Sequence, residues 1–205
     1  MIKLVKTPSF LHQLFPDLLW RFSTNEKVLY LTFDDGPHPL LTPWVLNCLK
    51  QFQAKATFFC VGNNVEKYPD VYEQIISEGH HVGNHTHNHL RGWTTTSEKY
   101  VDNVHQCQKL VNSTLFRPPY GRITPKQIRQ LKRTYKIVMW DVLSWDFSQQ
   151  TPPEKCLNNV IDHSKSGSII VFHDNKNAEE NMKHALPLIL SHFSKLGYCF
   201  EVIPY

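Results

Sequence analysis

Val28-Leu-Tyr-Leu-Thr-Phe33 is followed directly by Asp34-Asp35-Gly36-Pro37, and this short segment predicts the class of fold. A near-continuous apolar run that ends at an Asp-Gly-Pro turn is typical of a buried strand. Strands that are apolar on both faces belong to parallel sheets that helices cover. The segment therefore predicts an α/β fold in which two acidic side chains follow a strand. Read by itself, the acidic pair is typical of a turn.

The alternation of strand-like and helix-like segments continues to the C-terminus. Further strands are expected at residues 56–61, 80–84, 115–117, 135–140, 168–172 and 198–203, and helices at residues 42–52, 64–78, 97–111, 124–133, 153–163 and 178–196. Repeated strand–helix units imply parallel pairing with helices on the faces. Such units either close into a barrel or form an open sheet, and periodicity does not decide between the two.

Composition excludes several classes of protein. The chain has 205 residues, of which 41% are hydrophobic and 20% charged, so it is expected to fold as one domain without long disordered tracts. The net charge is +4, but the lysines and arginines are scattered along the sequence, which argues against nucleic acid as a partner. We expect the protein to be a monomer.

No segment is typical of a signal peptide or a membrane span, so the sequence as written predicts a soluble, cytoplasmic protein, with action on a cell wall left open.

Histidines gather in the segment His85-Thr-His-Asn-His89. His85 and His89 are four residues apart, so one helical turn would direct both imidazoles at one ion. The nearby His80, His81 and His87 compete for this role, and an exposed His-rich loop is the simpler interpretation. Together with a carboxylate from an earlier strand end, the pair forms a two-His, one-carboxylate set. Such a set suits zinc-dependent hydrolysis and also non-haem iron oxygenation.

Three later segments also carry polar groups. Arg117-Pro-Pro-Tyr-Gly121 is typical, taken alone, of a rigid loop with an exposed arginine. His173 follows an apolar strand, and a lone histidine there is more often a hydrogen-bonded core residue than a catalyst. A carboxylate partner would convert His173 into a tuned general acid, and Asp146 and Asp174 are the carboxylates that accompany it in these segments.

These segments occur in a fixed order that resembles a known family. The order is Thr32-Phe-Asp-Asp-Gly-Pro37, His85-Thr-His-Asn-His89, Arg117-Pro-Pro-Tyr-Gly121, the segment from Trp140 to Phe147, and Val171-Phe-His-Asp174. The set resembles the polysaccharide deacetylases with a NodB homology domain, carbohydrate esterase family four. The resemblance covers the chain from about Val28 to the C-terminus. We therefore expect a NodB-like deacetylase domain at residues 28–205 and an N-terminal extension, residues 1–27, packed on it.

The resemblance implies a fold, a metal and a substrate class. The fold would be a deformed (β/α) barrel of about seven parallel strands. Asp35, His85 and His89 would bind one divalent ion, with Zn²⁺ expected first and Co²⁺ or Ni²⁺ as alternatives. The enzyme would be a hydrolase that removes N-acetyl groups from GlcNAc-containing oligo- or polysaccharides such as peptidoglycan or chitooligosaccharides. The alternative within the family is an acetyl ester hydrolase acting on a polysaccharide such as xylan.

The resemblance also implies a role for each remaining motif residue. Asp34 would be the general base, and Arg117 would pair with it and hold it ionised. Tyr120 would donate its backbone N–H to the oxyanion. His173 would be the general acid, oriented by Asp146, which would also raise its pKa. Two further residues would form walls of the acetyl pocket: Val171 and Trp140.

Two other functions explain fewer of these residues. An iron-dependent oxygenase would use the same three ligands but gives Asp34 and the Asp146–His173 pair no role. A non-enzymatic glycan-binding protein on a hydrolase scaffold would bind sugar equally well after Asp34→Asn.

Overall fold

A computed structural model describes residues 4–205. Nine strands form one sheet in the order β1-β6-β5-β4-β3-β2-β8-β7, with β9 pairing against β2, and every ladder is parallel. The strands are β1 (Leu18–Leu19), β2 (Val28–Asp34), β3 (Ala56–Cys60), β4 (His81–Asn84), β5 (Leu115–Phe116), β6 (Lys136–Val138), β7 (Val142–Leu143), β8 (Ile169–His173) and β9 (Cys199–Phe200).

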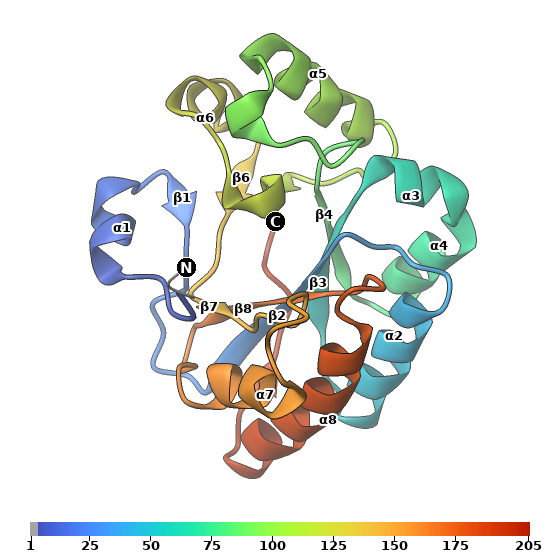
Figure 1. The fold of residues 1–205 in the computed structure, drawn as a ribbon, viewed down its shortest axis with the longest axis vertical. Coiled ribbons are helices and arrows are strands. Elements are labelled where there is room, and N and C mark those ends of the chain that lie inside the picture. Colours follow the sequence, from blue (N-terminus) through green and yellow to red (C-terminus); the bar gives the residue numbers. More distant parts are fainter. Residues whose placement is uncertain (1–3) are drawn as a thin grey trace.

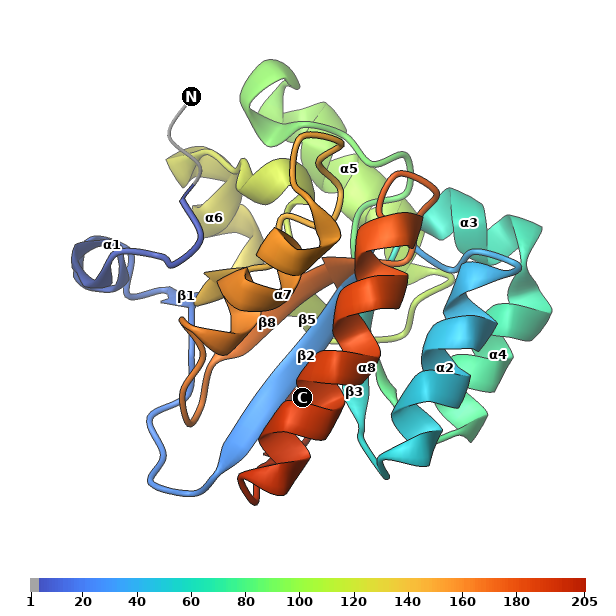
Figure 2. The same cartoon turned by 60° about the horizontal axis from the view of Figure 1, so that its bottom comes forward.

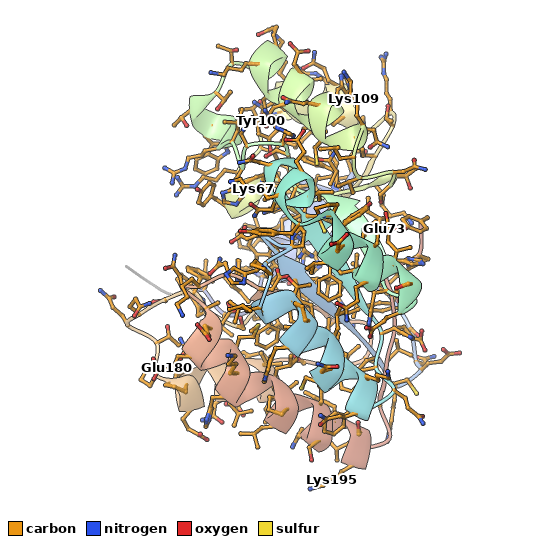
Figure 3. The ribbon with its side chains drawn as sticks, turned by 90° about the vertical axis from the view of Figure 1, so that its right-hand side faces the viewer. Lys67, Glu73, Tyr100, Lys109, Glu180 and Lys195 are labelled. Carbon is orange, nitrogen blue, oxygen red and sulfur yellow. The ribbon has the colours of Figure 1, made fainter. Side chains whose placement is uncertain are left out.

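The sheet curls into an incomplete barrel that helices surround (Figure 1). The helices are α1 (Ser9–Leu14), α2 (Leu41–Gln51), α3 (Gly62–Lys67), α4 (Pro69–Ser77), α5 (Ser97–Gln108), α6 (Pro125–Leu131), α7 (Pro153–Ile161) and α8 (Glu179–Lys195), with short 3₁₀ turns η1 (Gly92–Thr94) and η2 (Pro119–Gly121). Figure 2 shows α8 lying over β2, and Figure 3 shows α2 between α4 and α8. The predicted deformed (β/α) barrel is confirmed.

The predicted strand at Val28–Phe33 lies in the interior of the sheet. As β2 it pairs with β3 on one side and β8 on the other. Leu29, Leu31 and Phe33 are fully buried in the main hydrophobic cluster, together with apolar side chains of α2 and α8. Full burial of one such side chain stabilises the fold by about 1.5–3 kcal/mol. The opposite face of β2 points into the barrel and carries Tyr30, Thr32 and Asp34, of which Thr32 and Asp34 are buried.

The barrel is open between β1 and β7, the two edges of the sheet. Isolated antiparallel bridges between Lys6 and Val142 and between Arg21 and Ser168 cross this gap. Lys6 also forms an ion pair of 3.1 Å with the buried carboxylate of Asp141. The described part of the N-terminal segment thus contacts the barrel and supplies strand β1, while the boundary at residue 27 stays a prediction.

The predicted helix at residues 64–78 is divided in two. Helix α3 ends at Lys67 and α4 begins at Pro69. Between them Tyr68 has φ −133° and ψ 56°. The division has a local cause, because the proline ring disfavours helical geometry at the residue before it.

No helix within residues 4–205 combines the length and the apolar character needed to cross a lipid bilayer.

The start of α6 carries a reciprocal cap and gives a stability prediction. The Thr124 hydroxyl accepts from the backbone N–H of Gln127, whose side chain accepts in return from the Thr124 N–H at 2.9 Å. Losing a cap of this kind costs about 1 kcal/mol, so Thr124→Ala should lower the free energy of unfolding in urea by that amount. Thr134→Ala is the matched control, because Thr134 is exposed after the same helix. Equal unfolding curves for the two variants would contradict the prediction.

Candidate active site

The carboxyl ends of the central strands meet at one edge of the sheet, and the motif residues lie there. Asp34 is the last residue of β2, and it is in register with His173, the last residue of β8. Parallel strands of α/β folds place their sites at this edge. The side chains enclose a cavity of about 400 Å³, lined by Asp34, Asp35, His85, His89, Tyr120, Gly121, Trp140, Leu143, Phe147, Val171, His173 and Asn177.

Asp35, His85 and His89 come together in this cavity. Oδ1 of Asp35 lies 2.9 Å from Nε2 of His89 and 3.5 Å from Nε2 of His85. One possible ligand atom from each residue lies within 4.8 Å of the others. Although Oδ1 is buried and close to both imidazoles, it accepts no hydrogen bond from the described residues. Its lone pairs are therefore available to a cation.

Neighbouring groups leave one ligand atom free on His85 and one on Asp35. Nδ1 of His85 lies 2.8 Å from the carbonyl oxygen of Arg117. Since a carbonyl only accepts, Nδ1 carries the proton and Nε2 keeps its lone pair. The Asn175 amide donates to Oδ2 of Asp35 at 2.6 Å, which leaves Oδ1 for a cation, and the Asn64 amide donates to the Asp35 carbonyl at 2.8 Å. Sequence reasoning missed both asparagines, although Asn175 stands directly after the last motif.

The electrostatics of the triad favour the ligand form of its carboxylate. Burial raises the pKa of Asp35, but the imidazoles of His85 and His89 outweigh burial and hold that pKa well below its ordinary value. One carboxylate oxygen and two imidazole nitrogens suit a divalent ion such as Zn²⁺ and leave coordination positions open. These residues therefore fit the metal that the resemblance implies.

The helical turn predicted for His85–His89 is wrong, because the segment is an irregular loop. Asn84 ends β4, and its side-chain oxygen accepts from the N–H of Thr86 at 2.9 Å. This contact bends the chain immediately after the strand. Thr86 and His89 have φ of 63° and 54°. The loop brings the two imidazole rings to 5.1 Å without helical spacing.

The competing histidines make other contacts. Nδ1 of His80 accepts from the N–H of Ala56, and burial lowers the pKa of His80 to about 4. His81 contacts the carbonyl oxygen of Ile203 at 2.8 Å. His87 lies 3.8 Å from Glu66. None of the three belongs to the cluster of possible metal ligands among the described residues.

Arg117 is fully buried and binds Asp34. Its Nη1 donates to Oδ1 of Asp34 at 2.7 Å and to the hydroxyl of Thr32 at 2.6 Å. Its other N–H groups donate to the carbonyl oxygens of Val138 and Met139. The exposed-loop interpretation of this arginine is thus wrong. The guanidinium supplies the counter-charge that a buried carboxylate requires. Within residues 4–205, Oδ2 of Asp34 accepts no hydrogen bond.

His173 and Asp146 form a second pair on the same cavity. Nδ1 of His173 lies 2.8 Å from Oδ1 of Asp146, and the His173 backbone N–H donates to Oδ2 at 2.7 Å. Burial lowers the pKa of His173, but the carboxylate of Asp146, with smaller contributions from Asp35 and Asp34, more than offsets burial, and the pKa rises to about 9. The Phe147 ring packs edge-on against the imidazole, with ring centres 5.0 Å apart. His173 is therefore protonated at neutral pH.

Tyr120 borders the cavity in an unusual backbone conformation. Its φ is 61°, and no described residue accepts a hydrogen bond from its backbone N–H. The next residue, Gly121, also has positive φ, and a Cβ there would lie 2.4 Å from the Trp140 ring. Glycine thus lets Trp140 pack against this turn. Strained backbone of this kind is common at functional sites.

Comparison with known proteins identifies the family. Residues 22–139 match the model of the polysaccharide deacetylase family. The chain belongs to this family. The family assignment agrees with the order of the five motifs and with the deformed barrel.

Individual relatives of this polysaccharide deacetylase cover three quarters or more of its length. A peptidoglycan-N-acetylglucosamine deacetylase of Bacillus cereus is 37% identical over 90% of each chain. A chitooligosaccharide deacetylase of Azorhizobium caulinodans is 32% identical over 75% of this chain and 77% of its own. A crystal structure of a peptidoglycan N-acetylglucosamine deacetylase in complex with 4-naphthalen-1-yl-N-oxidanyl-benzamide superimposes with a TM-score of 0.89 and 30% identity, covering 97% of this chain and 95% of that one.

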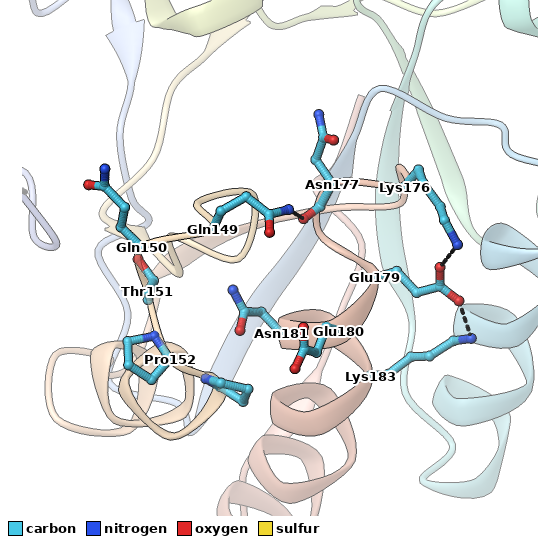
Figure 4. Close-up of a pocket in the computed structure, with 11 residues that line it drawn as sticks. Gln149, Gln150, Thr151, Pro152, Lys176, Asn177, Glu179, Glu180, Asn181 and Lys183 are labelled. Carbon is cyan, nitrogen blue, oxygen red and sulfur yellow. Dashed lines mark hydrogen bonds and ion pairs between the residues drawn. The ribbon is translucent and has the colours of Figure 1, made fainter.

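Two further hollows border the candidate active-site cavity of this polysaccharide deacetylase. A cavity of about 630 Å³ shares Asn177 with it and lies between the loop before α7 and the start of α8 (Figure 4). A hollow of about 330 Å³ shares Asp35 and His89 and is otherwise lined mainly by asparagines. Each of these two hollows thus shares lining residues with the central cavity, which suits a substrate longer than one sugar.

Proposed function

We propose that this member of the family is a metal-dependent hydrolase that removes N-acetyl groups from GlcNAc-containing glycans. The observation that carries the proposal is that Asp34, His173 and the Asp35–His85–His89 triad line one cavity, while Arg117 pairs with Asp34 and Asp146 with His173 behind its wall. Amide hydrolysis requires an activated nucleophile, a stabilised oxyanion and a proton for the leaving amine. The relatives named above, which act on peptidoglycan and chitooligosaccharides by their names, support this substrate class.

We assign the metal ligands to Asp35, His85 and His89, and the ion to Zn²⁺, with Co²⁺ or Ni²⁺ as substitutes. When bound, a divalent ion acts as a Lewis acid that acidifies water and polarises a carbonyl group. The cytoplasmic location and the monomeric state stay predictions.

The protein side chains then divide the proton transfers between them. Asp34 accepts a proton from the attacking water through Oδ2, while Arg117 holds the carboxylate in place through Oδ1. The Tyr120 N–H donates to the acetyl oxygen as negative charge develops on it. His173 gives the proton on Nε2 to the departing sugar nitrogen, and the positive charge on its ring disappears as the C–N bond breaks. Val171 and Trp140 line the cavity and would contact the acetyl methyl group.

Release of acetate tests this function. The purified protein, loaded with Zn²⁺ or Co²⁺, is incubated with chitooligosaccharides, with peptidoglycan and with acetylated xylan, and acetate is quantified. Acetate from the first two substrates supports N-deacetylation. Acetate from xylan alone would assign an esterase instead, and no acetate from any of them with metal bound would refute the proposal.

The His173–Asp146 pair predicts a change in pH dependence. His173 can donate only when protonated, and with a pKa of about 9 this form is complete at neutral pH and is lost as pH rises through 9. Asp146→Asn removes the largest of the charges that raise the pKa, so the alkaline limb of the kcat/KM profile should move toward the ordinary imidazole value of about 6.5. A bound cation affects both proteins alike, so the difference between the two profiles is the quantity to measure. Glu154→Gln, which alters the exposed contact between Glu154 and His184, is the matched control. An unchanged limb in Asp146→Asn would contradict the assignment.

A further inference from the structure

Four side chains form two stacked cation–aromatic pairs beside the active-site cavity, and we name them the mouth platform: Arg91, Trp93, Tyr120 and Arg122. The guanidinium of Arg91 lies 4.6 Å from the centre of the Tyr120 ring, and that of Arg122 lies 5.0 Å from the Trp93 ring. Tyr120 lines the cavity, and its ring centre is 4.7 Å from that of His89. The platform therefore begins where the proposed reaction takes place.

The aromatic rings of the mouth platform are open to solvent. Trp93 is 61% exposed and Tyr120 is 53% exposed. Exposed aromatic faces at the edge of a binding cavity are suited to contact the apolar face of a sugar ring, because such rings offer a large, rigid contact area.

The arginines of the mouth platform have no acidic partners in the part of the chain that the structure describes. Within residues 4–205, neither Arg91 nor Arg122 forms an ion pair with a carboxylate. Glu98, the acidic residue closest to Arg91 in the sequence, pairs with Lys126 at 2.6 Å. In the neighbouring hollow, by contrast, the two lysines Lys176 and Lys183 both contact Glu179 (Figure 4). The platform thus presents two positive charges that no carboxylate of residues 4–205 pairs with.

The backbone beneath the mouth platform is held firmly. The Trp93 indole N–H donates to the carbonyl oxygen of Ile123 at 3.2 Å. The buried amide of Gln127 donates to the carbonyl oxygen of Gly92 at 3.0 Å. A Cβ at Gly92 would lie 2.3 Å from the Arg122 carbonyl oxygen, so the two loops are in close contact. A platform fixed before binding loses little freedom when a ligand arrives.

We propose that the mouth platform binds carboxylate groups of the substrate, which is therefore an N-acetylated glycan that carries carboxylates beside the sugar to be deacetylated. This inference rests on the proposed function and narrows its substrate class. A guanidinium offers paired N–H donors that match the two oxygens of a carboxylate. Hydrolysis itself uses Asp34, His173 and the metal triad, so the two unpaired charges are left for substrate recognition. A neutral chitooligosaccharide would not use them.

The test compares substrates that differ only in charge. Peptidoglycan glycan strands with free lactyl carboxylates, strands with intact stem peptides, and the same materials with their carboxylates converted to neutral amides are assayed for acetate release. Each carboxylated substrate is compared with its own amidated form. For the native protein we expect a higher kcat/KM on the carboxylated form of at least one of the two substrates, and that substrate shows whether the lactyl group or the stem peptide supplies the carboxylate. Arg91→Gln and Arg122→Gln should each lower this preference about threefold, and the double variant roughly tenfold. Arg129→Gln, an exposed arginine on α6, is the matched control.

Salt dependence provides a second measurement. Raising the ionic strength should lower the preference of the native protein and leave that of the double variant unchanged, because exposed charges are screened. A native protein without preference, or a double variant that keeps the full preference, would overturn the inference while acetate release still supported the proposed function. No acetate from any substrate with metal bound would instead count against the proposed function itself.

Discussion

Asp34→Asn should lower kcat by roughly 10²–10⁴-fold while the protein keeps its metal. Asparagine has nearly the same shape as aspartate and can still accept the hydrogen bond that Arg117 donates at 2.7 Å. It cannot take a proton from the attacking water at neutral pH. Since the side chain of Asp34 is not among the three ligand groups, the metal content should remain that of the native protein. The measurements are acetate release and metal analysis of the same sample.

The control for Asp34→Asn must separate lost chemistry from lost stability. Removing one charge of a buried ion pair leaves the other uncompensated, which typically costs about 3–5 kcal/mol. Asp141→Asn is a matched control, because Asp141 is also buried and ion-paired, with Lys6 at 3.1 Å, but does not line the cavity. We expect Asp141→Asn to lose stability and keep its kcat. A folded Asp34→Asn protein with native kcat would refute the assignment of the base.

Much of this site could be predicted from the sequence because the local signals and the topology agree. Strand β2 is a near-continuous run of buried or half-buried side chains, which is typical of an interior strand of a parallel sheet. Because parallel strands end at the same edge of a sheet, the last residue of β2 and His173, the last residue of the later strand β8, must lie at that edge together. The order of the motifs then supplied partners that no single motif indicated, among them Arg117 for Asp34.

The features of the site that were not predicted depend on contacts between residues far apart in the sequence or on side chains outside the motifs. Residue type alone favoured an exposed Arg117, yet its guanidinium is fully buried because Asp34, Thr32 and two backbone carbonyl groups accept from it. The spacing of His85 and His89 suggested a helix, but the Asn84 side chain bends the chain after β4. Two-residue strands such as β1 and β7 are too short to show any periodicity.

His85→Ala and His89→Ala should abolish stable metal binding and, with it, acetate release. Each substitution removes one of the three ligand groups, leaving two, and a site with two protein ligands holds a divalent ion far more weakly. We expect the Zn²⁺ affinity to fall by more than roughly 100-fold, since losing only a residue that orients a ligand already costs about 10–100-fold. Competition with a fluorescent chelator measures the affinity without reference to turnover.

A graded series makes this prediction specific to the triad. Asn175→Ala removes only the amide that donates to Oδ2 of Asp35 at 2.6 Å, so its Zn²⁺ affinity should fall between those of the native protein and His85→Ala. His81→Ala should bind Zn²⁺ as the native protein does, because its imidazole contacts the carbonyl oxygen of Ile203 and lies outside the triad. Native affinity in both His85→Ala and His89→Ala would show that the ion is bound elsewhere. Asp34, the proposed base, and His173, the proposed acid, would then line a cavity that binds no cation, and the proposed mechanism would fail.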